Sequence, residues 1–478
     1  MKPALQFPPL FAERMRNQLG AGFDDFEAAM HESSTVAVRI HPQKWKGELS
    51  LDKIPWCDSG YYLDQRPLFT ADPWFQGGAY YVQEPSSMFL EQAFGAIRLP
   101  DQSTILDMCA APGGKTTHLL SLMKPDDLLV SNEVIRSRAV VLQENVQKWG
   151  YPNVVVTQND PQDFVLLKAF FDLVVVDAPC SGEGLFRKDP AALNEWSPGN
   201  AALCAARQKR IVSEAWKCLK PGGCLIYSTC TFNPEENEGN LRWLEEQSAA
   251  EGVEIKTDPA WNMETIRTGK MTGYQFFPHR LKGEGFFISV IRKSGNSENE
   301  LPGKFSGKIK NNIPLKVKEI LNNWIIPEYT GEFLTGNEEY CIFPASRLAT
   351  LSFLGKGLNI IQSGIPVASG PETKLNPHPA LAYSSVFNRQ AFPELPVRLT
   401  DAFRYLKKEV IPVMNSEKGW ILVTYRDIPL GWIKNIGTRA NNYFPKEWRI
   451  RMNINEIPQP WHETPTGRLG KEEMISIQ

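Results

Sequence analysis

Two cysteines follow apolar segments that have the composition of buried strands. Cys180 lies in DAPCSG directly after FDLVVV, and Cys230 lies in STCT directly after CLIY. Because parallel strands place their carboxyl ends at one edge of a sheet, we expect both thiols at that edge. A thiolate there can add to carbon 6 of cytosine, which makes carbon 5 nucleophilic enough to attack a sulfonium methyl group. The two positions therefore predict thiol chemistry at the sheet edge.

The residues around these thiols narrow the possible reactions, but they do not show which of the two sulfurs attacks. Asp177 closes the strand before Cys180, and its carboxyl group can support the addition through ring nitrogen 3 and the exocyclic amine. Methyltransferases that act on amino groups grip a base with Asp/Asn-Pro-Pro-aromatic, whereas Pro179 is followed here by Cys180. The other apolar-flanked cysteines have the pattern of small core residues; they are Cys204, Cys218 and Cys224.

A ligand-binding loop is predicted in the segment LDMCAAPGGKTTHLL. It reads as a strand, a loop with Pro112, Gly113 and Gly114, and then a helix. Small residues at this point let the backbone approach a ligand, and the helix amino terminus favours a carboxylate. A phosphate-binding P-loop is the competing interpretation, but its pattern needs glycine at position 109, which is Cys109.

Two acidic residues follow at later strand ends. Glu133 closes LLVSNE, where a carboxylate can accept both ribose hydroxyls of a nucleoside, and Asp160 follows VVVTQN, in reach of an adenine edge. Either residue alone would be typical of a solvated loop. Together, in this order, they favour a nucleoside site.

The elements that must position these residues alternate along residues 84–293, which predicts a mainly parallel sheet with crossover helices. Most of the strand segments are uninterrupted apolar runs, as in a sheet covered on both faces. The expected helices are Lys115–Met123, Arg136–Trp149 and Ala201–Leu219, the last ending at the turn KPGG. The expected strands are TILDMC, LLVSNE, VVVTQ, DLVVVD, CLIYST and FFISVIRK.

The chain around this region divides by composition. Residues 1–83 combine an amphipathic helical stretch with short strand-like segments, which indicates a small α+β domain. SGNSENELPG, within 294–304, is typical of a linker, and 305–385 form an intermediate region. Residues 386–478 show strand pairs separated by turns, and from residue 301 the chain has 22 Lys and Arg against 16 Asp and Glu. Any nucleic acid is therefore expected to contact the carboxyl-terminal part.

Bulk composition excludes several classes of protein. The 478 residues are 42% hydrophobic and 22% charged, with a mean hydropathy of -0.31, which is typical of a globular chain. No apolar run could span a bilayer and no signal peptide is visible, so we expect a cytoplasmic monomer without a membrane partner. Eight cysteines without a CxxC pair predict neither a disulfide framework nor a metal site.

These motifs resemble those of the RNA cytosine-5-methyltransferase family (RsmB/NOP/Sun type). The resemblance covers most of the chain and is carried by DMCAAPGGKT, Glu133, Asp160, DAPCSGEG with the following RKDP, and YSTCTFNPEEN; GAYYVQEPSS upstream also matches. It implies an α/β fold: a Rossmann-like class I methyltransferase core with a small α+β amino-terminal domain and a β-rich PUA-like carboxyl-terminal domain. The implied activity is methylation of carbon 5 of cytosine in RNA.

The resemblance also implies roles for particular residues. Cys230 is the expected nucleophile, Cys180 assists product release, and Asp177 acts as a base or positions the cofactor. S-adenosylmethionine is the expected cofactor. Its expected contacts are Cys109, Ala110, Ala111, Pro112, Gly113, Gly114, Lys115, Glu133, Arg138, Asp160 and Asp177.

RNA is the implied partner, with 16S rRNA, free or in the small ribosomal subunit, as the expected substrate. A tRNA methyltransferase and a catalytically silent RNA-binding assembly factor are the alternatives. The expected RNA contacts are Lys188, Lys434, Arg439, Lys446 and Arg449, with Arg451 nearby, and the last five lie among the aromatic residues Trp432, Tyr443, Phe444 and Trp448. Such a mixture suits phosphate contact and base stacking, with a charged solvated face as the alternative. Upstream, Arg39-Ile40-His41 replaces the family's usual Arg-Val-Asn, which leaves the RNA contacts of the amino-terminal domain open.

Overall fold

The computed structural model describes residues 6–189, 191–295, 313–336, 339–413, 418–454 and 456–463. Apart from residues 294 and 295, the predicted linker 294–304 lies outside the described residues, as does the end of the chain from residue 464. Among the helices of these segments, none is long and apolar enough to cross a membrane.

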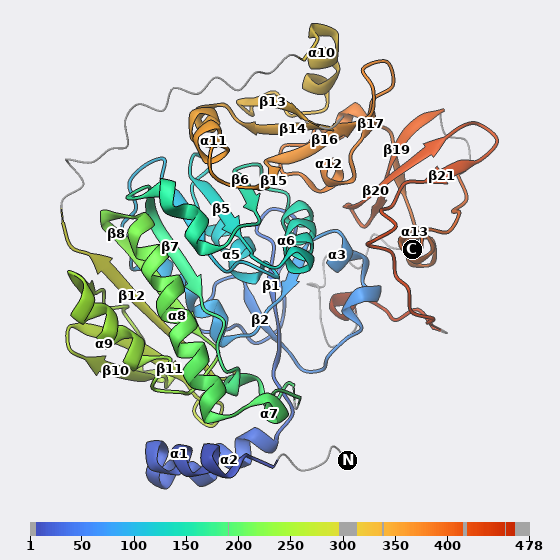
Figure 1. Ribbon diagram of the computed structural model, residues 1–478. Coiled ribbons are helices and arrows are strands. Elements are labelled where there is room, and N and C mark those ends of the chain that lie inside the picture. The colour runs from blue at the N-terminus through green and yellow to red at the C-terminus, as the bar shows by residue number, and fades with distance from the viewer. Residues whose placement is uncertain are drawn as a thin grey trace.

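A ten-stranded sheet forms the centre of the molecule (Figure 1). Its order is β10-β11-β12-β8-β7-β4-β5-β6-β15, with β9 paired to β12. The neighbours from β8 to β6 in this order are parallel, as predicted, and this parallel part carries the residues of interest at its carboxyl edge. The strands are β4 (Thr104–Asp107), β5 (Leu128–Asn132), β6 (Val154–Thr157), β7 (Phe171–Asp177), β8 (Leu219–Thr229), β9 (Ala250–Gly252), β10 (Glu264–Thr268), β11 (Met271–Phe276), β12 (Phe286–Lys293) and β15 (Ile360–Ser363).

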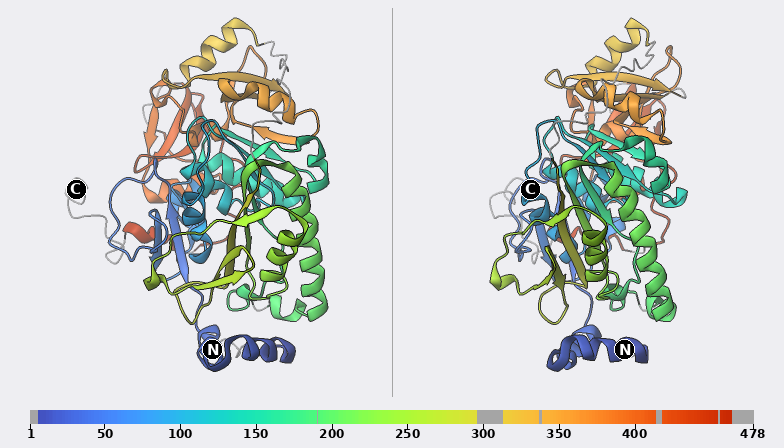
Figure 2. Two further views of the ribbon diagram at one scale, coloured as in Figure 1. Left: turned by 90° about the vertical axis from the view of Figure 1, so that its left-hand side faces the viewer. Right: turned by 60° about the vertical axis from the view of Figure 1, so that its left-hand side comes forward.

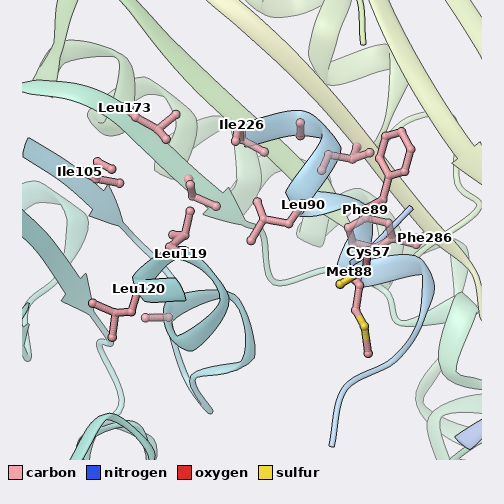
Figure 3. Packing of buried hydrophobic residues seen from close by; sticks show 14 of the residues in the cluster. Cys57, Met88, Phe89, Leu90, Ile105, Leu119, Leu120, Leu173, Ile226 and Phe286 are labelled. Atoms are coloured by element: carbon pink, nitrogen blue, oxygen red, sulfur yellow. The ribbon is translucent and has the colours of Figure 1, made fainter. Parts of the chain in front are cut away.

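Helices cover both faces of this sheet, which explains the uninterrupted apolar strands. On β7, Leu173 packs with the cluster under α4 (Leu90–Gly95), α5 (Gly114–Leu122) and α6 (Arg136–Trp149). The next residue, Val174, packs on the opposite face with α8 (Pro198–Cys218) and α9 (Glu238–Gln247). Figure 3 shows the first cluster, in which Leu90, Leu119 and Leu120 lie near strand residues Ile105, Leu173 and Ile226.

The prediction of a mainly parallel sheet is confirmed, and two features go beyond it. The segment FFISVIRK forms β12, but it runs antiparallel to β8. The sheet also continues beyond residue 293, because β15 from the intermediate region pairs with β6. This pairing satisfies an edge that would otherwise expose backbone groups. Element ends differ slightly: α5 and α8 begin at Gly114 and Pro198, and β8 begins at Leu219, so the KPGG turn lies within its bounds.

The amino-terminal region has two parts. Helices α1 (Pro9–Leu19) and α2 (Phe23–His31) pack their apolar faces on Phe186, Trp196, Phe232 and Phe277 of the methyltransferase core. In Figure 1 these helices lie beside α7 (Ala191–Glu195), at the end of the molecule far from the carboxyl-terminal sheets. The second part is an antiparallel sheet of β1 (Val36–Ile40), β2 (Gly60–Leu63) and β3 (Tyr80–Val82), with α3 (Pro73–Gln76) between β2 and β3 in the chain.

The region after residue 313 forms two further four-stranded sheets, visible as the orange and red parts of Figure 2. Buried residues of the last sheet and of α13 share one cluster with the first domain, where Trp45 and Tyr80 pack with Tyr405 and Leu430. The three-stranded sheet of the amino-terminal region is therefore packed against the last sheet. The elements are α10 (Leu315–Asn323), β13 (Gly331–Gly336), β14 (Glu339–Pro344), α11 (Leu348–Leu354), β16 (Ile365–Ser369), β17 (Asn376–Pro377), α12 (Pro379–Tyr383), β18 (Glu394–Pro396), α13 (Leu399–Leu406), β19 (Gly419–Tyr425), β20 (Ile428–Asn435) and β21 (Ala440–Asn442).

Candidate active site

A pocket of about 300 Å³ opens at the carboxyl edge of the parallel strands. Its walls come from residues 81–84 and Ser87, from the loop after β4, and from residues 284–286. Asp177, Leu185 and Cys230 complete the wall, whereas Cys180 and Gly113 do not line it. The structure thus brings the predicted loop and the strand ends of β7 and β8 to one cavity.

The loop after β4 is shaped by a glycine. Gly113 has φ +116°, in the left-handed region that a side chain rarely adopts, and it directly precedes α5. Arg39, fully buried, supports the start of this helix by donating to Thr117 Oγ1 at 2.7 Å and to the Gly114 carbonyl at 3.4 Å. The Arg39-Ile40-His41 segment therefore makes its polar contacts inside the protein, since His41 is also buried and forms a hydrogen bond with the Trp149 carbonyl at 2.9 Å.

Asp107, at the end of β4, is a candidate site residue that the sequence motifs had not singled out. Its side chain is fully buried, and Thr116 Oγ1 donates to Oδ2 at 2.7 Å. Its Oδ1 has no hydrogen-bond partner among the described residues. Burial raises the pKa of Asp107 to about 7. A carboxylate at a strand end, directly before the glycine loop in LDMC, was the signal that could have identified it.

Lys115 and Asp177 form an ion pair in the pocket wall. Lys115 Nζ lies 2.7 Å from Asp177 Oδ2, and Ser228 Oγ donates to Asp177 Oδ1 at 2.8 Å. The pair joins the glycine loop to the ends of β7 and β8. It presents a donor and an acceptor together, which is the combination that a base edge requires.

The two thiols are adjacent, with 3.1 Å between the Cys180 and Cys230 sulfur atoms. Both cysteines are free. Contact with the Cys230 sulfur, together with burial, raises the pKa of Cys180 well above its ordinary value. Cys180 therefore holds its proton near neutral pH, and its thiol can donate to the Cys230 sulfur.

A buried polar cluster connects the loops that carry these thiols. Ser181 donates from its backbone to Glu236 Oε2 at 3.0 Å and from its hydroxyl to Glu236 Oε1. Gln208 Nε2 of α8 donates to Glu236 Oε2 at 2.7 Å, and Thr231 Oγ1 lies 2.9 Å from Ser181 Oγ. These bonds hold the two loops in a fixed relation.

The residues expected to contact a nucleoside lie beside the pocket rather than in its wall. Glu133 is buried and accepts from the Ile135 backbone at 3.0 Å. Arg138 lies 3.5 Å from Glu133 and donates to the Ala111 carbonyl at 2.7 Å, so both residues adjoin the cofactor loop. Asp160 caps the 3₁₀ turn Pro161–Leu167 and pairs with Arg210 at 3.0 Å.

The residues expected to contact RNA are scattered. Lys188 is exposed, on the loop that follows Cys180. Lys434 lies over the Trp420 ring, 4.7 Å from its centroid. The remaining basic residues lie between or after the carboxyl-terminal strands; they are Arg439, Lys446, Arg449 and Arg451.

The prediction of base stacking in this region needs correction. Trp432 and Phe444 are buried in two hydrophobic clusters and cannot stack on a base. Tyr443, 41% exposed, keeps an accessible ring, and Trp448 packs near Tyr383. Aromatic residues in this tail mainly build the core.

One cluster could hold a metal ion by distance alone. The ligand atoms of Cys57, Glu91 and His118 lie within 4.8 Å of one another. His118 Nδ1 is buried without a partner among the described residues, whereas a metal-binding histidine usually donates its second nitrogen to a neighbour. Burial, and to a smaller extent the charge of Arg39, lowers the pKa of His118 to about 4. The cluster is better described as a buried polar contact, and the absence of a metal stays a prediction.

Three family models match the chain. The model described as 16S rRNA methyltransferase RsmB/F matches residues 96–292. The model for the N-terminal domain of 16S rRNA methyltransferase RsmF matches residues 7–85, and the methyltransferase RsmF PUA domain matches residues 392–450.

Curated relatives are similar along nearly the whole chain. Ribosomal RNA small subunit methyltransferase F of Escherichia coli (strain K12) is 32% identical over 480 residues, which cover 92% of this chain and 96% of the relative. The protein of the same name from Escherichia fergusonii has the same identity and coverage.

Solved structures share the fold of the core. A methyltransferase homolog protein from Pyrococcus horikoshii superposes with a TM-score of 0.52 at 27% identity, covering 60% of this chain and 96% of that one. NSun6 from the same organism has a TM-score of 0.51 at 21% identity, covering 61% of this chain and 100% of the other, and shows the common fold.

Proposed function

Because the chain belongs to the 16S rRNA methyltransferase RsmB/F family and is therefore a methyltransferase, we propose that it methylates carbon 5 of a cytosine in 16S rRNA, with S-adenosylmethionine as the methyl donor. The observation that carries this proposal is the position of Cys230 in the pocket wall, 3.1 Å from a second thiol that retains its proton. Nucleophilic addition to cytosine needs such a sulfur.

The pocket fits the methyl donor. Directly before the loop, though not in the pocket wall, buried Asp107 has an oxygen without a partner among the described residues, and such an atom is costly unless a ligand donates to it. The start of α5 provides backbone N–H groups for a carboxylate. S-adenosylmethionine supplies an electrophilic methyl group when bound. Asp107, the 109–115 loop, Glu133 and Arg138 would hold it.

The chain's own residues would then perform the addition and elimination. The Cys230 thiolate bonds to carbon 6, and carbon 5 of the ring takes the methyl group. The Lys115–Asp177 pair offers its donor and acceptor to the polar edge of the base. The carbon 5 proton must then leave, and its electron pair re-forms the double bond as the bond from Cys230 to carbon 6 breaks.

The second thiol has a role that changes with the state of the first. While Cys230 is a thiolate, contact with it holds the proton on Cys180. Once Cys230 is bonded to carbon and has lost its charge, that effect ends and Cys180 can release its proton to solvent. Cys180 can then accept the carbon 5 proton, and the elimination returns a thiolate on Cys230. This sequence releases one proton per methyl group, as the overall reaction requires.

RNA recognition is proposed for regions outside the pocket. The PUA-domain match at residues 392–450 and the exposed basic residues there support RNA contact by the carboxyl-terminal domain, residues 386–478. Residues 1–83 and 84–293 are proposed as the amino-terminal and methyltransferase domains. The monomeric state and the cytoplasmic location stay predictions.

A methyl-transfer assay tests the function. The protein is incubated with isotopically labelled S-adenosylmethionine and, separately, with 16S rRNA, small ribosomal subunits and tRNA, each from cells lacking the protein. Digestion to nucleosides followed by mass spectrometry should find labelled 5-methylcytidine in 16S rRNA or small subunits. Label found only in tRNA would show that tRNA is the substrate and 16S rRNA is not. Label in a nucleoside other than 5-methylcytidine would overturn the proposed chemistry.

A further inference from the structure

Helix α1 places one arginine against the loop that carries Cys180. The helix buries Phe11, Ala12 and Met15 on its core-facing side. Arg14 projects from the same turn, and its guanidinium reaches Glu183 in the 177–184 loop. In Figure 1, α1 lies beside α7, close to the end of the core from which this loop emerges.

Glu183 is a fully buried carboxylate with four donors. Arg14 donates to Oε1 at 2.9 Å and to Oε2 at 2.7 Å, in a bidentate pair. Trp196 Nε1 donates to Oε1 at 2.8 Å, and the Phe232 backbone donates to Oε2 at 3.3 Å. Each oxygen therefore has two partners, and one of the four belongs to the loop that follows Cys230.

The same segment also contacts Cys230 directly. The N–H of Gly184 donates to the Cys230 carbonyl at 2.9 Å. A Cβ atom on Gly184 would lie 2.3 Å from the Gly285 carbonyl oxygen, so only glycine allows this approach. Leu185, the next residue, lines the pocket. Glu183 and Gly184 thus connect the two thiol loops to each other and to the pocket wall.

We propose that Arg14 is a positioning residue for the methyl transfer: through Glu183 it fixes the backbone that holds Cys230. Arg14 supplies the positive charge that is paired with the buried carboxylate, and it is the only basic side chain bonded to Glu183 in the described part of the chain. Without it, the carboxylate is buried without a paired charge, which is costly, so the side chain is expected to move. Such a movement weakens its bond to the Phe232 backbone and shifts Cys230.

This role predicts an effect on the chemical step rather than on substrate binding. Arg14 is hydrogen-bonded to Glu183 and does not line the pocket, so it is not expected to contact the base. A displacement of about 1 Å at a reacting group can lower a rate about 100-fold. The inference rests on the proposed function, because the measured step is attack by Cys230.

The test measures the rate at which the protein forms a covalent complex with RNA that contains 5-fluorocytidine, in the presence of S-adenosylmethionine. Arg14→Met should lower the maximal rate about 100-fold with little change in the RNA concentration that gives half-maximal rate. Arg16→Met is the matched control, because Arg16 lies on the same helix, is exposed and stacks over Phe23. Its rate should stay within about 2-fold of wild type.

A double-mutant cycle separates positioning from general damage. If Arg14 acts through Glu183, Arg14→Met combined with Glu183→Gln should be no slower than the slower single variant, since the two changes break one interaction. Arg14→Ala should regain rate when millimolar ethylguanidinium is added, and Arg16→Ala should not respond. Affinity for S-adenosylhomocysteine and the circular dichroism spectrum should match wild type, which shows that the fold is retained.

The outcomes are distinguishable. If wild type and Arg16→Met also fail to form the complex, the proposed function fails and not the role of Arg14. If wild type reacts and Arg14→Met reacts equally fast, or requires more RNA at an unchanged maximal rate, the positioning role is overturned. Additive losses in the double variant would overturn the route through Glu183.

Discussion

The loops after β7 and β8 each carry one thiol, but the two sulfurs have different surroundings. Cys230 lines the pocket, whereas Cys180 is not part of its wall. Contact with Cys230 and burial raise the pKa of Cys180, so the sulfur outside the wall retains its proton. Position in the sequence made the two thiols equivalent; their exposure to the cavity and their mutual contact make them different.

This difference supports the roles proposed for the two thiols. An attacking sulfur must reach the base and lose its proton, and Cys230 meets the first condition in this structure. A sulfur that keeps its proton at rest suits a later step, after its neighbour has been neutralised. Resemblance to a family had suggested the same assignment, and the geometry now supplies an independent argument.

The largest expected effect comes from removing the attacking sulfur. Cys230→Ala should lose all detectable methyl transfer, because the other thiol in the described pocket wall, Cys109, lies in the cofactor loop and burial raises its pKa well above the ordinary value. Cys224→Ala is the matched control, since Cys224 lies on β8, the strand that ends just before Cys230, but outside the pocket. Turnover by Cys230→Ala in the methyl-transfer assay would contradict the different roles proposed for the two loops.

Removing the second sulfur should leave attack intact and impair release. Cys180→Ala should lower turnover by about 10²- to 10⁴-fold, the range typical of a lost proton-transfer group. A covalent complex with ordinary RNA should then accumulate as a slower band on denaturing gels. Normal turnover in this variant would remove Cys180 from the mechanism.

A pH experiment tests the burial of a third titratable group at this sheet edge, the carboxyl group of Asp107. The pKa of Asp107 is about 7 in the fold and about 3.9 in an unfolded chain. Between these values the folded state retains a proton that the unfolded state has lost. The free energy of unfolding should therefore fall by on the order of 4 kcal/mol as pH rises from 4 to 7. Asp107→Asn should lack this slope in urea melts, and an unchanged slope would contradict the assignment.

Alkylation measures the coupling between the thiols directly. In wild type, Cys180 should react with iodoacetamide only at high pH, because contact with Cys230 raises its pKa. In Cys230→Ala that cause is removed, so the pKa of Cys180 falls toward its ordinary value and labelling at a given pH becomes faster. Peptide mass spectrometry gives the two profiles, and identical profiles would show that burial alone controls Cys180.

The smallest effect concerns the carboxyl-terminal domain, far from both loops. Replacing Lys434 or Arg439 with Ala should weaken RNA binding modestly and reduce the slope of log affinity against log salt by about 1 each. Turnover at saturating RNA should not change. If the slope is unaffected, or if deletion of residues 386–478 leaves affinity and salt dependence unchanged, the RNA-binding proposal for this domain is wrong.

Local sequence patterns predicted much of the site but fewer of the contacts that hold it in place. Apolar runs and glycine loops identified β4 to β8, the cofactor loop and both thiols at one edge, because these signals lie in adjacent residues. The pairing of β15 with β6 and the antiparallel β12 depend on contacts between segments distant in sequence. Arg14 and Glu183 are 169 residues apart, so no local pattern connects them.

The same reason explains the error in the tail. Trp432 and Phe444 alternate with basic residues in the sequence and resemble a stacking surface, but the packing of β20 and the following loop directs them inward. Which face of a strand is covered is decided by its partners. Asp107 differs from these residues: its position before the glycine loop is visible in the sequence, but its complete burial depends on the packing around β4.

The central claim is that Cys230, and not Cys180, attacks the base. RNA containing 5-fluorocytidine is incubated with the wild-type protein and S-adenosylmethionine, and the trapped complex is digested with nuclease and protease. Mass spectrometry of the modified peptide should place the methylated fluoronucleotide on Cys230. A nucleotide attached to Cys180 would contradict the account.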